Sequence, residues 1–228
     1  MNELISIKQG DKVMSFNCKE HWENVYGQKR PVEVSWYQVE PAVSLKLIAS
    51  TEIDHAAKII DVGSGASALV DKLLDQGFRN VTVLDISSKA IHYVQERLGR
   101  RAENVCWIEA DVTEFKSSVQ YDFWHDRAVF HFLTDAEGRT QYVRRLEDAI
   151  KPGGHVVIAA FAIDGPPKCS ELDVERYDPE KMKNELGESF ELINSVSETH
   201  ITPWNKQQKF IYCHFKKIIN CYNQKHNI

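Results

Sequence analysis

Residues 58–67, KIIDVGSGAS, decide the fold of this chain. A short apolar run ends in an acid, Asp61, and two glycines follow at alternate positions before a helix-like segment. A second apolar run, residues 81–84, ends in another acid, Asp85. Parallel α/β sheets build a nucleotide-sized pocket in this way, at the carboxyl ends of their first two strands. The stretch therefore predicts an α/β domain that binds a nucleotide-like cofactor.

Composition and charge limit the partners of the chain. At 228 residues, with 43% hydrophobic and 27% charged side chains, it has the size and composition of a single globular domain. Its net charge of -5 is the opposite of the basic excess typical of nucleic-acid-binding proteins, so we expect no nucleic-acid partner. The five cysteines form no CxxC pair and the histidines lack metal-ligand spacing, so we expect neither a disulfide framework nor a metal site.

The compartment follows from what the sequence lacks. No apolar run approaches the roughly 20 residues of a membrane-spanning helix, so we expect no membrane partner. The opening residues, MNELISIKQGDK, lack the basic and apolar regions of a signal peptide. A reduced, cytoplasmic protein is therefore expected.

Strand-like and helix-like segments alternate through the middle of the chain. Strands are predicted at residues 58–62, 80–84, 104–109, 121–125 and 155–161, and helices at 68–76, 88–98 and 135–150. This alternation predicts a doubly wound, mostly parallel α/β sheet, and two closely spaced strands at 190–200 and 209–215 predict an antiparallel hairpin at its end. We expect a single domain over residues 1–217, with a helical N-terminal cap (1–55) and a Rossmann-like core (56–217), followed by a flexible tail (218–228).

The acids around the glycine loop bear on which cofactor binds there. Asp85 lies 20 residues after Gly65 and can accept hydrogen bonds from two ribose hydroxyls, which an NAD site would also require. Asp61 lies two positions before Gly63, where its carboxylate would repel a pyrophosphate but attract a cationic amino-acid ligand. These residues favour a cofactor that joins an adenosine to a cationic amino acid.

A third acid follows the next predicted strand. Asp111 can accept a hydrogen bond from an adenine amino group, and the adenine ring would lie between Ile86 and Val112. The three acids thus stand at the ends of three successive strands, where one ligand can reach all of them.

Five motifs together resemble the class I S-adenosylmethionine-dependent methyltransferases. The resemblance covers residues 58–215, with DVGSGAS, VLDIS, EADV, YDFWHDRAVFHFL and KPGGHVVIAAF in the order of that family. It implies a seven-stranded sheet with a reversed last hairpin and S-adenosyl-L-methionine as cofactor. It also implies that Gly63 and Gly65 flank the methionine part, that Asp85 holds the ribose, and that Asp111 and Val112 hold the adenine. The candidate cofactor-binding residues are Asp61, Gly63, Ser64, Gly65, Asp85, Ile86, Asp111, Val112, Asp126, Trp36 and Tyr37.

The segment after the fourth strand is expected to border the transferable methyl group. Asp126, Arg127 and the alanine that follows resemble the equivalent segment of the thiopurine and tellurite methyltransferases, which favours a small or soft acceptor. Methyl transfer from a sulfonium is an in-line displacement, so the protein mainly aligns the reactants and excludes water. A base is required only if the acceptor arrives protonated, and the candidates for that catalytic role are Asp126, His131 and His125.

Aromatic side chains upstream of the core are candidates for a lid, since aromatic faces attract a sulfonium cation and help to exclude water. Trp36 and Tyr37 belong to this set. For Arg127, an ion pair and substrate binding both remain open. The candidate substrate-binding residues are Trp22, Tyr26, Arg127, Cys169, Arg176, Tyr177 and Trp204.

The expected function is transfer of a methyl group to a nucleophilic acceptor, with a small thiol or other soft nucleophile preferred. A protein-lysine methyltransferase of the same fold is the alternative, and Asp126 would then serve as its base. A nicotinamide-dependent oxidoreductase is compatible with Asp85 and the glycine loop, although Asp61 and Asp111 argue against it. A noncatalytic cofactor-binding module is the third class. The sequence leaves the acceptor and the oligomeric state open.

Overall fold

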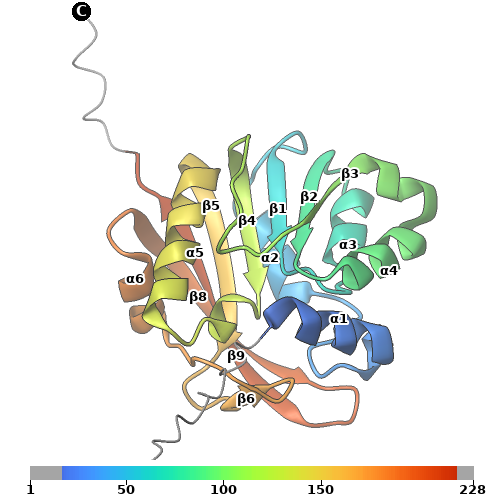
Figure 1. Ribbon diagram of the computed structural model, residues 1–228. Coiled ribbons are helices and arrows are strands. Elements are labelled where there is room, and N and C mark those ends of the chain that lie inside the picture. The colour runs from blue at the N-terminus through green and yellow to red at the C-terminus, as the bar shows by residue number, and fades with distance from the viewer. Residues whose placement is uncertain (1–16, 220–228) are drawn as a thin grey trace, which may run out of the picture.

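The computed structural model describes residues 17–219, which contain a seven-stranded sheet in the order β3-β2-β1-β4-β5-β9-β8 (Figure 1). The strands are β1 (Lys58–Val62), β2 (Asn80–Asp85), β3 (Val105–Glu109), β4 (Tyr121–Arg127), β5 (Ile150–Phe161), β8 (Phe190–Ile201) and β9 (Gln207–Lys217). The first five strands pair in parallel, whereas β9 runs antiparallel to both β5 and β8. This confirms the predicted mostly parallel sheet with a reversed last hairpin.

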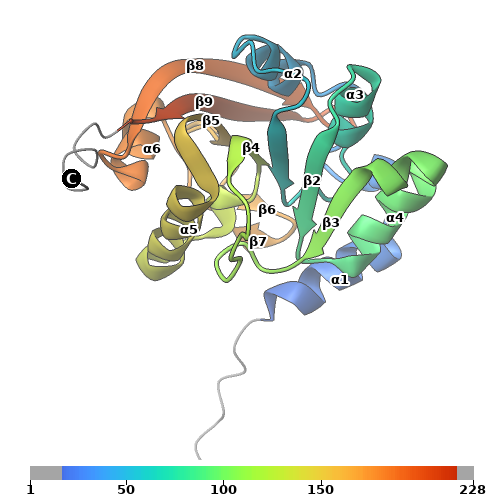
Figure 2. The ribbon, with the colours of Figure 1, turned by 90° about the horizontal axis from the view of Figure 1, so that it is seen from above.

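Helices cover both faces of the sheet, as Figure 2 shows. They are α1 (Cys18–Gln28), α2 (Ala42–Ala49), α3 (Leu69–Asp75), α4 (Ser88–Leu98), α5 (Ala136–Ala149) and α6 (Pro179–Leu186). Successive residues of a strand point to opposite faces, so Trp124 of β4 packs in one core with α5 and α6 while Phe123 packs in the other with α2, α3 and α4. Within residues 17–219, no helix is long and apolar enough to cross a membrane.

Short elements complete the chain where the sequence predicted loops. They are the 3-10 helices η1 (Pro31–Glu33), η2 (Gly99–Asn104) and η3 (Phe130–Phe132), and the two-residue strands β6 (Lys168–Cys169) and β7 (Leu172–Asp173). The turn between β6 and β7 consists of Ser170 (φ 48°) and Glu171 (φ 68°). Two-residue hairpin turns favour glycine or asparagine at such angles, so the residues of this turn do not predict a hairpin.

The junction of α5 and β5 differs from the prediction. The helix ends at Ala149 and the strand already begins at Ile150, whereas the predicted strand begins at residue 155. Tyr121 of β4 pairs with Ile150, and Phe123 pairs with His155, so the register shift leaves residues 151–154 as a bulge. The two glycines and the proline of this segment therefore bend a continuous strand rather than separate a helix from it.

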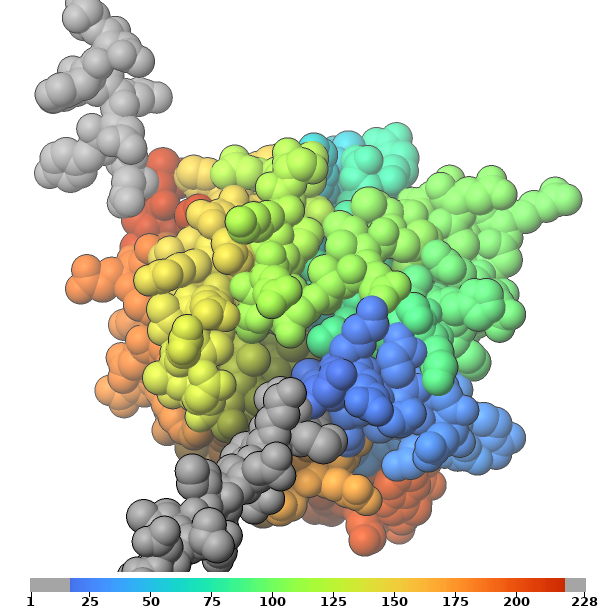
Figure 3. Space-filling model, in the orientation of Figure 1, coloured from blue at the N-terminus to red at the C-terminus, as the bar shows by residue number. Residues whose placement is uncertain are grey.

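The N-terminal cap places α1 across the carboxyl ends of β2 and β3. The Glu23 carboxylate accepts hydrogen bonds from the Ser88 backbone N–H (2.7 Å) and hydroxyl (2.9 Å) at the amino end of α4, where negative charge is favoured. Lys19 forms an ion pair with Glu109. Figure 3 shows the blue surface of α1 lying against the green surface of the core. Residues 1–16 of the predicted cap and 220–228 of the predicted tail lie outside the described residues.

Candidate active site

A cavity opens at the carboxyl ends of the central strands, beneath α1. It has about 780 Å³ of empty space including its open mouth, and we call it the larger cavity because the cavity that adjoins it has about 480 Å³. The predicted cofactor-binding residues that line it are Trp36, Gly63, Asp85, Ile86, Asp111 and Val112. The predicted substrate-binding residues that line it are Trp22, Tyr26, Arg127 and Cys169. Residues far apart in the sequence thus meet at one site.

Asp85, at the end of β2, ties the glycine loop to the strand. Its Oδ2 accepts a hydrogen bond from the Gly65 N–H (2.7 Å) and its Oδ1 accepts one from the Ser87 N–H (2.8 Å). The side chain is buried, and burial raises the pKa of its carboxyl from 3.8 to about 6, although the two N–H groups oppose that shift. Each carboxylate oxygen has a further lone pair that can accept a hydrogen bond from a ligand hydroxyl.

Both glycines of the loop are required by the backbone and by space. Gly63 (φ 58°) and Gly65 (φ 55°) are in the left-handed region that favours glycine. A Cβ on Gly63 would lie 1.9 Å from Val129 Cγ2, and a Cβ on Gly65 would lie 2.2 Å from the Tyr26 hydroxyl oxygen. The second distance shows that Tyr26 of α1 rests directly on the loop.

At the far side of the larger cavity, Asp111 lies between Ala110 and Val112, which also line it. The Asp111 Oδ1 accepts hydrogen bonds from the Thr113 N–H (2.8 Å) and hydroxyl (2.7 Å), which fix the carboxylate. Ile86 contributes apolar surface from the end of β2. This arrangement offers one acceptor beside two aliphatic walls, which suits a flat heteroaromatic ring.

A smaller cavity adjoins the larger one, and the two share Trp36, Gly63 and Arg127 as lining residues. Asp61, Ser64 and Tyr37 also line it. Within the described part of the chain, Asp61 Oδ2, Ser64 Oγ and Arg127 Nη2 are buried and have no hydrogen-bond partner. Leaving such groups unsatisfied costs free energy, so their concentration around one cavity indicates a polar ligand.

Arg127 is held on its other sides. Its Nε donates to the Tyr212 hydroxyl (2.9 Å) and its Nη1 donates to the Trp36 carbonyl (2.9 Å). The guanidinium carbon lies 4.4 Å from the centroid of the Phe210 ring, and Nη2 lies 3.8 Å from Glu198 Oε2, which is an ion pair too long for a hydrogen bond. The predicted alternatives for Arg127 are therefore compatible, since an ion pair orients a guanidinium that also borders both cavities.

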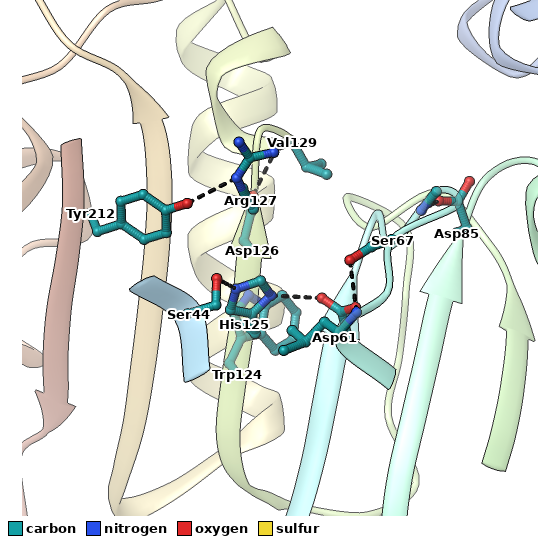
Figure 4. Close-up of polar contacts among 12 residues, drawn as sticks. Ser44, Asp61, Ser67, Asp85, Trp124, His125, Asp126, Arg127, Val129 and Tyr212 are labelled. Carbon is teal, nitrogen blue, oxygen red and sulfur yellow. Dashed lines mark hydrogen bonds and ion pairs between the residues drawn. The ribbon is translucent and has the colours of Figure 1, made fainter. Parts of the chain in front are cut away.

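His125 is buried and uses both of its ring nitrogens. Its Nδ1 lies 2.7 Å from Asp61 Oδ1 and its Nε2 lies 2.9 Å from the Ser44 hydroxyl (Figure 4). The ring lines the smaller cavity, where neither nitrogen is available to take a proton from an acceptor.

The other two predicted bases do not line either cavity. Asp126 is fully buried and accepts hydrogen bonds from the N–H groups of Val129 (2.9 Å) and Phe130 (3.1 Å) and from the Tyr142 hydroxyl (2.6 Å). Burial raises the pKa of Asp126 to about 6. His131 is also fully buried, and burial lowers its pKa to about 3. The geometry does not support the predicted catalytic roles of these residues, nor a direct cofactor contact by Asp126.

Aromatic rings form the roof of the larger cavity. The Trp22 ring meets Phe132 edge-on at 5.1 Å and Trp36 at 5.8 Å between centroids. Cys169 lies in the wall, and burial raises the pKa of its thiol to about 12, so it stays protonated at neutral pH. These rings and the thiol give an apolar, water-excluding surface.

Three predicted substrate-binding residues lie away from both cavities. Arg176 donates to the Gly165 carbonyl (3.2 Å), Tyr177 is fully buried against Phe130, and Trp204 is half-exposed near the tip of the β8–β9 hairpin. Sequence reasoning did not single out eight lining residues of the larger cavity, which are Cys18, Val62, Leu84, Ala110, Ala128, Val129, Phe132 and Leu133. The last four lie within the motif YDFWHDRAVFHFL, but the direction of their side chains could not be predicted because the chain turns sharply at Ala128 (φ 71°).

Comparisons with known proteins find methyltransferases. A family model described as a methyltransferase domain matches residues 59–154. Nodulation protein S of Rhizobium tropici is 30% identical over 114 residues, which are 50% of this chain and 47% of that protein. EEF1A lysine methyltransferase 2 of Homo sapiens is 25% identical over 200 residues, which are 80% of this chain and 78% of that protein. The chain thus matches about half the length of the nodulation proteins but most of the human enzyme.

A solved structure shows the same fold. The N-methyltransferase NodS from Bradyrhizobium japonicum, in complex with S-adenosyl-L-homocysteine, superimposes with a TM-score of 0.65 at 17% identity and covers 86% of this chain and 98% of its own. The chain is thus similar to a methyltransferase domain over residues 59–154, and it shares the fold of that N-methyltransferase.

Proposed function

We propose that this protein transfers the methyl group of S-adenosyl-L-methionine to a small, soft nucleophile such as a thiol. The observation that carries the proposal is the pair of adjoining cavities. The larger one offers Asp85 to ribose hydroxyls and Asp111 to an adenine. The smaller one offers an anion and a cation, Asp61 and Arg127, to an amino-acid end.

The smaller cavity supports the methionine part of the cofactor over a pyrophosphate. An α-ammonium group would satisfy Asp61 Oδ2, and an α-carboxylate would satisfy Arg127 Nη2 and the Ser64 hydroxyl. These three atoms are the ones, among the described residues that line the smaller cavity, that are buried without a hydrogen-bond partner. A pyrophosphate would satisfy Arg127 but would place two negative charges beside the buried Asp61. The dinucleotide alternative is therefore disfavoured by charge.

The chemistry requires little proton transfer from the protein. When bound, the cofactor would supply a methyl group on a sulfonium: the acceptor lone pair would bond to the methyl carbon while the carbon–sulfur bond breaks and the sulfur leaves as a neutral thioether. Trp22, Trp36 and Phe132 would face this positive charge and exclude water from it. The main contribution of the chain is to orient the two reactants.

The larger cavity favours an acceptor that needs no base. Among the residues that the structure describes, the titratable ones that line this cavity are Asp85 and Asp111 at the adenosyl end, and Cys18, Tyr26, Arg127 and Cys169 elsewhere. Burial raises the pKa of both thiols and of Tyr26, which makes them poor bases at neutral pH because they are protonated. A thiol with a pKa of about 8.5 loses its proton to water often enough for its thiolate to react without a base, whereas a lysine ammonium with a pKa of about 10.4 needs a base to lose its proton. A protein lysine remains the alternative because lysine methyltransferases are among the relatives.

The test combines binding with label transfer. Calorimetry should show binding of S-adenosylmethionine and its demethylated product, and a cofactor with a tritiated methyl group should label small thiols in a panel of thiols, amines and protein fractions. Asp85→Ala is the control, because loss of the ribose acceptor should weaken binding by about 30-fold or more. Label in lysine residues would support the protein-lysine methyltransferase instead of the thiol methyltransferase. Cofactor binding without transfer of label to any acceptor would favour the noncatalytic module. Binding of NADH without binding of either adenosyl ligand would refute the proposal.

The predicted compartment remains the cytoplasm. The four cysteines in the described part of the chain, Cys18, Cys106, Cys169 and Cys213, are free thiols, which suits a reducing environment.

A further inference from the structure

Three buried side chains connect helix α2 to the smaller cavity. Ser44 lies on α2, His125 on β4 and Asp61 on β1, and their relative exposures are 0%, 2% and 2%. The distances are 2.9 Å from Ser44 Oγ to His125 Nε2 and 2.7 Å from His125 Nδ1 to Asp61 Oδ1. Figure 4 shows the imidazole ring lying between the serine and the carboxylate.

We propose that Ser44 and His125 are positioning residues that hold Asp61 in place for the ammonium group of the cofactor's amino-acid end. The inference rests on the proposed function and deepens it. Asp61 and His125 are partners in the parallel register of β1 and β4, so their side chains leave the sheet side by side. The contact with Ser44 fixes the outer edge of the ring against a helix that packs on the same face.

The direction of the hydrogen bonds supports this role. An ionised carboxylate only accepts hydrogen bonds, so His125 Nδ1 donates to Asp61 Oδ1. The ring orientation that the Ser44 contact fixes therefore also fixes the rotation of the carboxylate. Within the described residues, Asp61 Oδ2 is left buried without a partner, and Asp61 lines the smaller cavity. A cationic N–H donor of a ligand would complete its hydrogen bonding.

These residue types also form the Ser-His-Asp triad of hydrolases, but the arrangement here excludes that chemistry. In a hydrolase the serine hydroxyl faces the substrate and the carboxylate lies behind the histidine. Here Ser44 is fully buried and lines neither cavity, whereas the carboxylate is the member that borders the ligand space. The hydrogen-bonded series Ser44–His125–Asp61, which we call the relay, therefore orients an anion and does not activate a nucleophile.

The positive charge of the ligand's ammonium group explains why the relay would be needed. A buried carboxylate without full compensation is costly, and removal of a donor from it is more costly still. The His125 donor compensates one oxygen, and the ligand ammonium would compensate the other. Arg127 borders the same cavity and would hold the carboxylate of the same amino-acid end, so the relay and Arg127 would recognise opposite charges.

The test uses two ligands that differ only in the amino-acid end. S-adenosylhomocysteine has that end, and 5′-methylthioadenosine lacks it while it keeps the adenosyl thioether. In His125→Leu, which fills similar space without a donor, S-adenosylhomocysteine should bind about 10–100-fold more weakly, while 5′-methylthioadenosine should change by less than about twofold. His125→Asn should restore much of the affinity, because its amide nitrogen is attached to Cγ as Nδ1 is.

Ser44→Ala is the milder variant and should cost about 3–10-fold for S-adenosylhomocysteine alone. Its matched control is Ser50→Ala at the end of the same helix, where the hydroxyl donates to the Leu47 carbonyl (2.7 Å) and takes no part in the relay. Thermal unfolding without ligand monitors the fold, and if His125→Leu does not fold, Ser44→Ala decides. Equal losses for both ligands, or no loss for S-adenosylhomocysteine, would overturn the inference. Failure of the unmutated protein to bind either ligand would instead refute the proposed function.

Discussion

Acidification from pH 8 to pH 5 should weaken the binding of S-adenosylhomocysteine about tenfold, and Asp85 should be the cause. The carboxylate accepts two backbone N–H groups and is only 5% exposed. Burial raises its pKa from 3.8 to about 6, so it is ionised at pH 8 and largely protonated at pH 5. The ribose hydroxyls of a ligand would donate to the ionised form, so protonation removes an acceptor.

The magnitude follows from the fraction ionised. With a pKa of about 6, roughly nine-tenths of the free protein would carry the proton at pH 5, and the apparent dissociation constant would rise about tenfold. The same carboxyl affects stability in the opposite direction. A folded pKa above the unfolded value means that its stabilising contribution is complete below pH 3.8. That contribution, about 3 kcal/mol, is then lost as the pH rises through 6.

Calorimetric titrations at pH 5, 6, 7 and 8 would measure the effect, with Asp85→Asn as the matched variant. The amide should bind more weakly than the carboxylate at high pH, and its affinity should not vary with pH in this window. Asp126 also has a pKa of about 6 but lines neither cavity. The same dissociation constant at pH 5 and pH 8 in the unmutated protein, or an unchanged pH profile in Asp85→Asn, would refute the reasoning.

Three further substitutions test separate parts of the structure. Gly65→Ala should lower the affinity for S-adenosylhomocysteine more than tenfold in a titration, because its Cβ would lie 2.2 Å from the Tyr26 hydroxyl oxygen. The control is Gly99→Ala (φ 57°, open space), which should cost only about 1 kcal/mol of stability in urea unfolding; equal effects of the two variants on affinity would contradict the steric argument. Tyr142→Phe should lower the free energy of unfolding by about 2–3 kcal/mol in urea, because it removes a hydrogen-bond donor from the buried Asp126, and it should leave ligand affinity unchanged. A loss below about 0.5 kcal/mol would show that this hydrogen bond contributes little to stability. Glu23→Gln should speed the dissociation of S-adenosylhomocysteine about 3–10-fold in stopped-flow fluorescence, because it weakens the contact of α1 with the amino end of α4. Glu20→Gln on the same helix should leave the rate unchanged, and similar rates in both variants would contradict a role of Glu23 in holding α1 over the cavity.

The sequence was sufficient for the parts of the fold that depend on local patterns. Strands β1 and β2 are apolar runs that end in acids, and an acid at the end of a parallel strand has to lie at the edge where ligands bind. Asp85 and Asp111 were therefore found at the larger cavity, as predicted. The β6–β7 hairpin could not be predicted, because Ser170 and Glu171 adopt positive φ values that their side chains disfavour.

The site was harder to predict where side-chain direction matters. Asp126 and His125 are neighbours on β4, so they point to opposite faces, and neither points at the larger cavity. Asp126 was chosen for its place in a motif, but the direction of a strand residue depends on a register that only the folded sheet defines. Ser44 gave no signal, because its partner His125 is 81 residues away and serine is common on helices.

The position of α1 has a consequence for turnover. The helix lies over the larger cavity, with Trp22 and Tyr26 in the lining and Glu23 at the amino end of α4. If spent cofactor leaves by this route, α1 has to undock once in every catalytic cycle. The residence time of the product would then depend on a few polar contacts at the surface, and changes in ionic strength would alter the steady-state rate without touching the reacting atoms.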